Sequence, residues 1–174
     1  SMQTYDIVTI DGDGIGPEVN QSAIRVLREA CGSDLLRFCA FEGGAAHYQR
    51  SGQVLPPDTF EACRRSHAIL HGAAGLPGVT YADGTEVGND LHLQLRFKLD
   101  LFANVRPIRL LRGVRSPLAD WQPGQIDYVI VRENTEGLYA SRGAGVRLRD
   151  ELATDTLVVT RRGTERVARF AFEL

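Results

Sequence analysis

The chain has little cysteine, one tryptophan, one methionine and no long apolar run. Its three cysteines, Cys31, Cys39 and Cys63, are odd in number and contain no C-x-x-C pair, which fits reduced thiols better than a disulfide framework or a zinc knuckle. No stretch of 18 apolar residues is present, so the sequence predicts no membrane span and no membrane partner. We therefore expect a cytoplasmic protein.

Neither sign of charge dominates the composition. Lysine and arginine total 20 and aspartate and glutamate total 22, which gives a formal net charge of -2. A chain without a basic excess lacks the electrostatic field that holds nucleic acid, so we expect no nucleic-acid partner. The 174 residues are 43% hydrophobic, which is enough for a core.

Strand-like and helix-like periods alternate along the chain and predict an α/β fold. Strands are expected at residues 5–11, 35–41, 67–73, 100–105, 127–131, 138–148 and 152–160. Helices are expected at residues 17–32, 45–50, 57–65 and 165–174, and over a segment ending near residue 100 where Leu91, Leu95 and Leu99 recur four apart. The glycine- and proline-containing stretch over residues 75–88 is long enough to be a functional loop.

A glycine-rich string, D-G-D-G-I-G-P-E, stands between the first strand and the first helix, at residues 11–18. Glycines there allow the backbone to approach a ligand or a neighbouring segment closely. The dinucleotide pattern G-x-G-x-x-G is not met, because Pro17 stands where the third glycine belongs, and no Walker lysine follows. Simple glycine punctuation and a generic nucleotide loop both remain open on this string alone.

Three longer strings carry a family resemblance. They are V-T-I-D-G-D-G-I-G-P-E-V at residues 8–19, L-R-F-K-L-D-L-F-A-N-V-R-P at residues 95–107, and V-R-E-N-T-E-G-L-Y at residues 131–139. Their order and spacing resemble the N-terminal half of the isopropylmalate/isocitrate dehydrogenase family, which includes homoisocitrate and tartrate dehydrogenases. Residues 161–173 are similar to the helix that follows in that family.

The resemblance implies an α/β, isopropylmalate-dehydrogenase-like fold: an open mixed sheet with helices on both faces, incomplete in this chain, plus a protruding two-stranded arm at about residues 138–160. Residues 1–104 would begin the larger, cofactor-side domain, and residues 105–174 the smaller substrate and dimerisation domain. The arm's strands have little apolar face and carry charges around their turn. Pairing with a second copy would cover their edges, so we expect a homodimer.

The resemblance also implies a substrate site. Planar guanidinium groups bind carboxylates through paired hydrogen bonds, as a hydroxy diacid requires. In the family the arginines matching Arg96, Arg106 and Arg132 hold the substrate, and the tyrosine matching Tyr139 donates a proton to the enolate carbon after carbon dioxide leaves. Other arginines, among them Arg109, Arg112 and Arg115, are expected to be surface charges.

The expected reaction is NAD- or NADP-dependent oxidative decarboxylation of a malate-like 2-hydroxy acid, assisted by Mg²⁺ or Mn²⁺. No metal ligand is expected within the chain, because the family's aspartates and its catalytic lysine lie beyond the position of Leu174. The loop expected to touch the nicotinamide end consists of His71, Gly72, Ala73, Ala74 and Gly75, although its H-G-A-A-G-L-P departs from the family's usual G-S-V-G-G-P style.

Substrate choice in the family depends on the residue four before the first arginine, which is His92 here. A polar residue at this position favours an isocitrate-like or tartrate-like acid over isopropylmalate, unless His92 is an ordinary helix-surface histidine. The sequence leaves open which acid is used. It also leaves open whether this chain is a truncated, inactive part of an enzyme or a non-catalytic fragment or interaction module.

Overall fold

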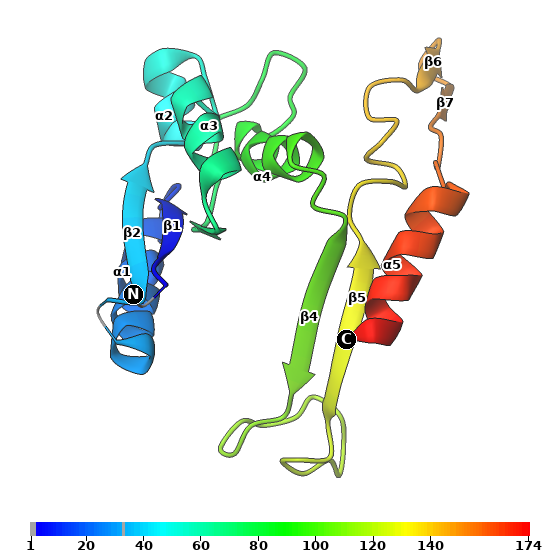
Figure 1. Cartoon of the computed structure of the whole chain (residues 1–174). Helices are drawn as coiled ribbons and strands as arrows, with labels where there is room; N and C mark the ends of the chain where they lie inside the picture. The colour runs from blue at the N-terminus through cyan, green and yellow to red at the C-terminus, as the bar shows by residue number, and fades with distance from the viewer. Residues whose placement is uncertain (1–2, 33) are drawn as a thin grey trace. The chain divides into compact units, whose positions relative to one another are not determined.

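The computed structural model describes residues 3–32 and 34–174. The chain forms two compact units, Ser1–Leu99 and Asp100–Leu174, whose helices and strands are labelled in Figure 1. Five helices combined with small sheets confirm the expected α/β class, with parallel pairing in the first unit and antiparallel pairing in the second. No helix in the described part of the chain has the length and apolar character that crossing a bilayer requires.

A three-stranded parallel sheet lies at the centre of the first unit. Strand β1 (Tyr5–Ile10) lies between β2 (Leu36–Phe41) and β3 (Ala68–His71). Its last residue, Ile10, pairs with the last residue of β3, His71. Because all strands are parallel, their carboxyl ends share one edge of the sheet, where ligands commonly bind in α/β folds.

The described residues of the first unit also form four helices: α1 (Gly16–Cys31), α2 (Ala45–Ser51), α3 (Pro57–Arg65) and α4 (Val87–Lys98). The expected leucine ridge on α4 is confirmed. Leu91 and Leu95 are fully or almost fully buried and belong to the core with Ile10 and Val87, and Leu99 packs against that core. The buried ridge fixes α4 against the rest of its unit and so positions the polar residues on its other faces.

The second unit begins with an antiparallel pair, β4 (Ala103–Arg109) and β5 (Asp127–Glu133). The bounds expected for the first of these strands, residues 100–105, are wrong. The observed strand β4 starts later because Asp100 has a φ of 50°, outside the extended region. It continues through Pro107, which lacks an N–H but is tolerated because β4 has a single ladder neighbour among the described strands.

The chain's last helix, α5 (Arg161–Glu173), runs alongside β5 (Figure 1). The apolar period predicts a helix over residues 165–174, which starts too late, whereas the helix over residues 161–173 that the family resemblance implies is observed. Thr160 caps the helix: its side chain accepts a hydrogen bond from the backbone N–H of Gly163 at 3.0 Å. A threonine at this position satisfies one of the unpaired N–H groups of the first turn, so the helix begins earlier than its apolar pattern.

The predicted arm contains a short antiparallel hairpin, β6 (Val146–Leu148) and β7 (Leu152–Thr154). The strands expected over residues 138–148 and 152–160 are therefore wrong in length. The residues before β6 fold into turns instead, and the buried hydroxyl of Ser141 donates a hydrogen bond to the backbone that follows β7. Together with a single antiparallel bridge between Gly137 and Val158, this contact closes the base of the arm, and the β6–β7 ladder forms at its tip.

Candidate active site

Two loops pack backbone to backbone at the carboxyl edge of the parallel sheet. A Cβ atom on Gly12 would lie 2.0 Å from the carbonyl oxygen of Ala73, and one on Gly72 would lie 2.1 Å from that of Asp11. A Cβ atom on Gly16 would likewise lie 2.0 Å from the Asp11 oxygen. No side chain fits at these distances, so close packing of the two loops accounts for these glycines without a bound phosphate.

Asp13 holds this edge together. Its buried carboxylate accepts hydrogen bonds from the backbone N–H groups of Ala45 and Ala46, at 2.7 and 2.8 Å, and from Gly75 at 2.8 Å. It thereby joins the loop after β1, the start of α2 and the loop after β3. This role could not be predicted from the sequence, because Asp13 stands inside the glycine string and its partners lie up to 62 residues away.

His71 is the polar side chain of the expected cofactor loop. Its Nδ1 contacts the carbonyl oxygen of Gly72, which can only accept, so Nδ1 carries the proton and Nε2 is an acceptor. Burial lowers the pKa of His71, which keeps the ring neutral. Among the described residues, Nε2 is buried without a hydrogen-bond partner. The His92 ring lies 6.5 Å from the His71 ring, and Arg96 follows His92 by one turn of α4.

In the second unit, two of the predicted substrate arginines share one face of the β4–β5 sheet. Asn104 pairs with Arg132 across the ladder, and Arg106 pairs with Ile130. Side chains of directly paired residues, and of residues two apart on one strand, lie on the same face. Arg106 and Arg132 are therefore diagonal neighbours, with Asn104 beside both.

Arg132 also contacts the predicted proton donor. Its guanidinium lies 5.7 Å from the centre of the Tyr139 ring, in the geometry of a cation–π interaction. Both residues line a surface cavity of about 850 Å³, together with apolar side chains of Leu138, Leu157 and Val159. An arginine and a tyrosine in one cavity can bind an anion and hold a transferable proton next to it.

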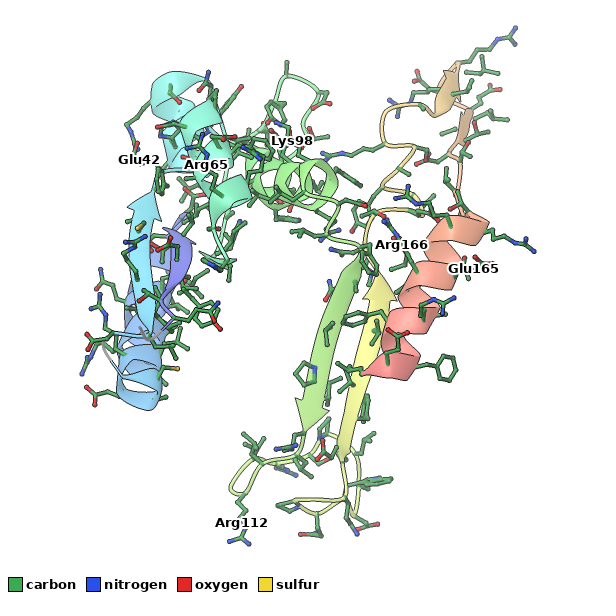
Figure 2. The ribbon with its side chains drawn as sticks, viewed as in Figure 1. Glu42, Arg65, Lys98, Arg112, Glu165 and Arg166 are labelled. Atoms are coloured by element: carbon green, nitrogen blue, oxygen red, sulfur yellow. The ribbon has the colours of Figure 1, made fainter. Side chains whose placement is uncertain are left out.

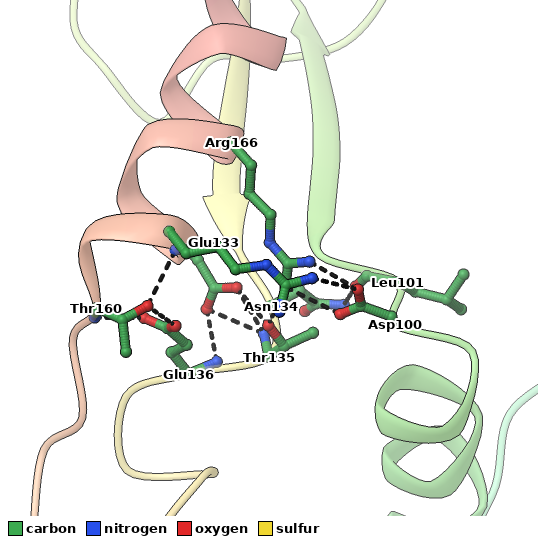
Figure 3. Close-up of polar contacts among 10 residues, drawn as sticks. Asp100, Leu101, Glu133, Asn134, Thr135, Glu136, Thr160 and Arg166 are labelled. Carbon is green, nitrogen blue, oxygen red and sulfur yellow. Dashed lines mark hydrogen bonds and ion pairs between the residues drawn. The ribbon is translucent and has the colours of Figure 1, made fainter.

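Hydrogen bonds fix the segment between Arg132 and Tyr139, as Figure 3 shows. The Glu133 carboxylate accepts hydrogen bonds from the N–H and hydroxyl of Thr135 and from the N–H of Glu136. Burial alone would raise the pKa of Glu133, but these hydrogen bonds outweigh it and lower the pKa. Glu136 in turn accepts from the backbone N–H of Thr160 at 2.9 Å, and Gly163 lacks the Cβ that would meet its carboxylate.

The structure places the predicted site residues in both units. The first unit contains His71, Gly72, Ala73, Ala74, Gly75, His92 and Arg96, and the second contains Arg106, Arg132 and Tyr139. The arginines expected on the surface, Arg109, Arg112 and Arg115, are exposed, and Arg112 points away from the strands in the β4–β5 connection (Figure 2). No group of three or more histidine, cysteine, aspartate or glutamate side chains in the described residues is placed to hold a metal ion.

Comparison with known proteins supports one family throughout. Residues 6–174 match the family described as isocitrate/isopropylmalate dehydrogenase. A 3-isopropylmalate dehydrogenase of Clavibacter sepedonicus is 45% identical over 99% of this chain and 49% of its own length. The chain thus spans about half the length of the curated relatives it matches.

Solved structures agree. A crystal structure of isocitrate dehydrogenase from Methylococcus capsulatus matches with a TM-score of 0.79 and 32% identity, over 98% of this chain and 47% of that one. A β-decarboxylating dehydrogenase from Thermococcus kodakarensis matches with a TM-score of 0.70 and 40% identity, over 98% of this chain and 45% of that one. The chain belongs to the isocitrate/isopropylmalate dehydrogenase family.

Proposed function

We propose that this chain supplies the substrate arginines and the proton-donating tyrosine for NAD(P)-dependent oxidative decarboxylation of a malate-like 2-hydroxy acid. The observation that carries the proposal is the shared face of Arg106 and Arg132, with Tyr139 stacked against Arg132, in a chain of this family. Two neighbouring guanidinium groups offer hydrogen-bond donors to two carboxylates of one small acid. The family resemblance gives Arg96, on α4, a substrate-binding role as well.

Tyr139 would act after decarboxylation. Loss of carbon dioxide from a 3-oxo acid leaves an enolate that must gain a proton at carbon, and a phenol hydroxyl is a suitable donor. Arg132 lies against the Tyr139 ring and would hold it beside the bound acid. Arg132 therefore has two roles in the proposal, binding a substrate carboxylate and orienting the tyrosine.

The loop of residues 71–75 would contact the nicotinamide end of NAD or NADP. His71 fits this role, because its buried Nε2 is an acceptor that lacks a partner among the described residues and a carboxamide amino group is a donor. The bound cofactor would accept a hydride from the hydroxyl carbon of the substrate. Asp13 would contribute indirectly, by holding Gly75 and hence the loop in place.

Mg²⁺ or Mn²⁺, the expected cations of this chemistry, bind hard oxygen ligands. Among the described residues, no cluster of acidic side chains is placed to bind them. The roles proposed for Arg106, Arg132 and Tyr139 involve only this chain's own side chains.

His92 would face the variable side group of the acid. The relatives named above are 3-isopropylmalate dehydrogenases, whose name specifies an apolar isopropyl group. A half-buried imidazole offers a hydrogen bond, and a positive charge when protonated, which suits a hydroxyl or carboxylate side group better. We therefore propose an isocitrate-like or tartrate-like substrate in preference to isopropylmalate.

A homodimer would form through the arm. Leu148 and Leu152, at the tip of the β6–β7 hairpin, are 57% and 49% exposed. Two strands of three residues each are not stable as an isolated hairpin in water. A second copy of the arm would extend the ladder and cover these leucines.

The reaction is tested on the purified natural protein, with NAD or NADP and Mg²⁺ and each of isocitrate, tartrate and 3-isopropylmalate. We expect reduced cofactor and carbon dioxide to form in equal amounts with at least one acid. Reduction without carbon dioxide release, or no reduction with any acid, would overturn the proposal.

A further inference from the structure

One of the three guanidinium nitrogens of Arg106 is held by a hydrogen bond within the protein. Its Nε–H donates a hydrogen bond to the side-chain oxygen of Asn104 at 3.1 Å. Asn104 lies two residues earlier on the same strand and face. This contact leaves the two terminal nitrogens of Arg106 to bind a ligand, because Nε points to a protein acceptor.

A relay of amide hydrogen bonds fixes Asn104 in turn. Its side-chain nitrogen donates to the side-chain oxygen of Asn134 at 3.3 Å, and the side-chain nitrogen of Asn134 donates to the carbonyl oxygen of Leu101 at 3.1 Å. The backbone N–H of Asn134 also donates to the carbonyl oxygen of Phe102 at 2.9 Å. The relay therefore ends on the backbone immediately before β4.

The orientation of both amides is determined by the ends of this relay. A guanidinium can only donate and a carbonyl oxygen can only accept. Asn104 must therefore turn its oxygen to Arg106 and its nitrogen to Asn134, and Asn134 must turn its nitrogen to Leu101. Flipping either amide would break two of the hydrogen bonds at once, so the relay has one satisfied arrangement.

We propose that Asn104 and Asn134 are positioning residues that hold Arg106 for end-on binding of a substrate carboxylate through its two terminal nitrogens. This inference rests on the proposed function of Arg106. Asn104 also stands directly opposite Arg132, so this residue lies beside both arginines on the same face. An arginine side chain that is already held in its binding position loses less conformational entropy when the ligand binds than a mobile one.

Proton exchange at arginine Nε tests the relay without substrate, so its result does not depend on whether the proposed reaction occurs. The sample is the 174-residue chain labelled with ¹⁵N, and the Arg106 signal is assigned by its loss in Arg106→Lys. We expect Asn104→Ala to speed exchange of the Arg106 Nε–H by about twofold to tenfold, the range that one net hydrogen bond supports. Asn134→Ala should act in the same direction, since it frees Asn104.

Two controls separate positioning from a general loss of structure. Arg109 donates its own Nε–H to Asp127 at 3.1 Å in the same sheet, and its exchange should not change in any variant. Asn104→Asp retains an acceptor and should keep the Arg106 Nε–H protected. Unchanged Arg106 exchange in Asn104→Ala or Asn134→Ala, or equal acceleration at Arg106 and Arg109, would overturn the proposal.

Discussion

Arg166 on α5 donates two parallel hydrogen bonds to the carboxylate of Asp100, at 2.7 and 2.9 Å, across 66 residues of sequence. The same guanidinium donates to the hydroxyl of Thr135 at 2.9 Å (Figure 3). It also lies 4.6 Å from the centre of the Phe102 ring. The bidentate pair joins the first residue of the second unit to its last helix, and Thr135 links it to the segment that leads to Tyr139.

Replacing Asp100 tests this pair through its pH dependence. The hydrogen bonds from Arg166 lower the pKa of Asp100. The unfolded chain therefore binds the proton first as pH falls, so the pair's stabilisation is present above about pH 4 and is lost as pH falls through the folded-state pKa. Because Asp100 is partly exposed, we expect Asp100→Asn to lower the free energy of unfolding by about 1 kcal/mol near neutral pH.

Urea denaturation of both proteins at about pH 7 and about pH 3 measures this difference. We expect the difference to shrink at the lower pH. An equal difference at both values would show that the ionised pair contributes nothing.

Asp13→Ala should strongly destabilise the first unit. The change leaves one buried and two half-buried backbone N–H groups without their carboxylate, which costs about 2 kcal/mol or more in the free energy of unfolding. Asp13→Asn retains one acceptor oxygen and should cost less. The matched control is Glu29→Gln, at an exposed position of α1, and a loss no greater than in that control would contradict the role of Asp13.

The parallel sheet and its helices could be predicted from the sequence because burial imposes a period on each element. The leucines of α4 and the apolar run of β1 show that period directly. The shared face of Arg106 and Arg132 also follows from the motif strings, once β4 and β5 are paired in register.

Side-chain contacts between distant segments could not be predicted in the same way. Asn104 and Asn134 stand inside the motif strings, but no periodicity reveals that their amides meet across 30 residues. The lengths of the arm strands were predicted wrongly for a related reason. The turns around Ser141 depend on its hydrogen bond to a residue that follows β7. This contact is not visible in the hydrophobic pattern of the residues around Ser141.

His92→Leu should shift substrate preference. Removing the imidazole leaves an apolar side chain facing the variable group of the acid, so the ratio of kcat/KM for 3-isopropylmalate to that for tartrate should rise about tenfold or more. The control is Gln94→Leu, two residues along α4. Equal ratios in wild type and His92→Leu would remove His92 from the substrate pocket.

Deleting residues 142–155 tests the arm. Ser141 and Thr156 are already in hydrogen-bond contact, so the deletion joins two neighbouring points of the chain. Sedimentation equilibrium should show a concentration-dependent dimer for the intact chain and a monomer after deletion. A monomer at every concentration before deletion, or a dimer that survives it, would refute the role of the arm.

The central claim is that Arg106 grips a substrate carboxylate, and Arg106→Lys in the natural protein tests it most directly. A lysine retains the charge but cannot form bidentate hydrogen bonds to a carboxylate, so kcat/KM for the preferred acid should fall about 100-fold. Arg109→Lys, on the same strand but the opposite face, should stay within about twofold of wild type. Equal kcat/KM values for Arg106→Lys and Arg109→Lys would contradict the account.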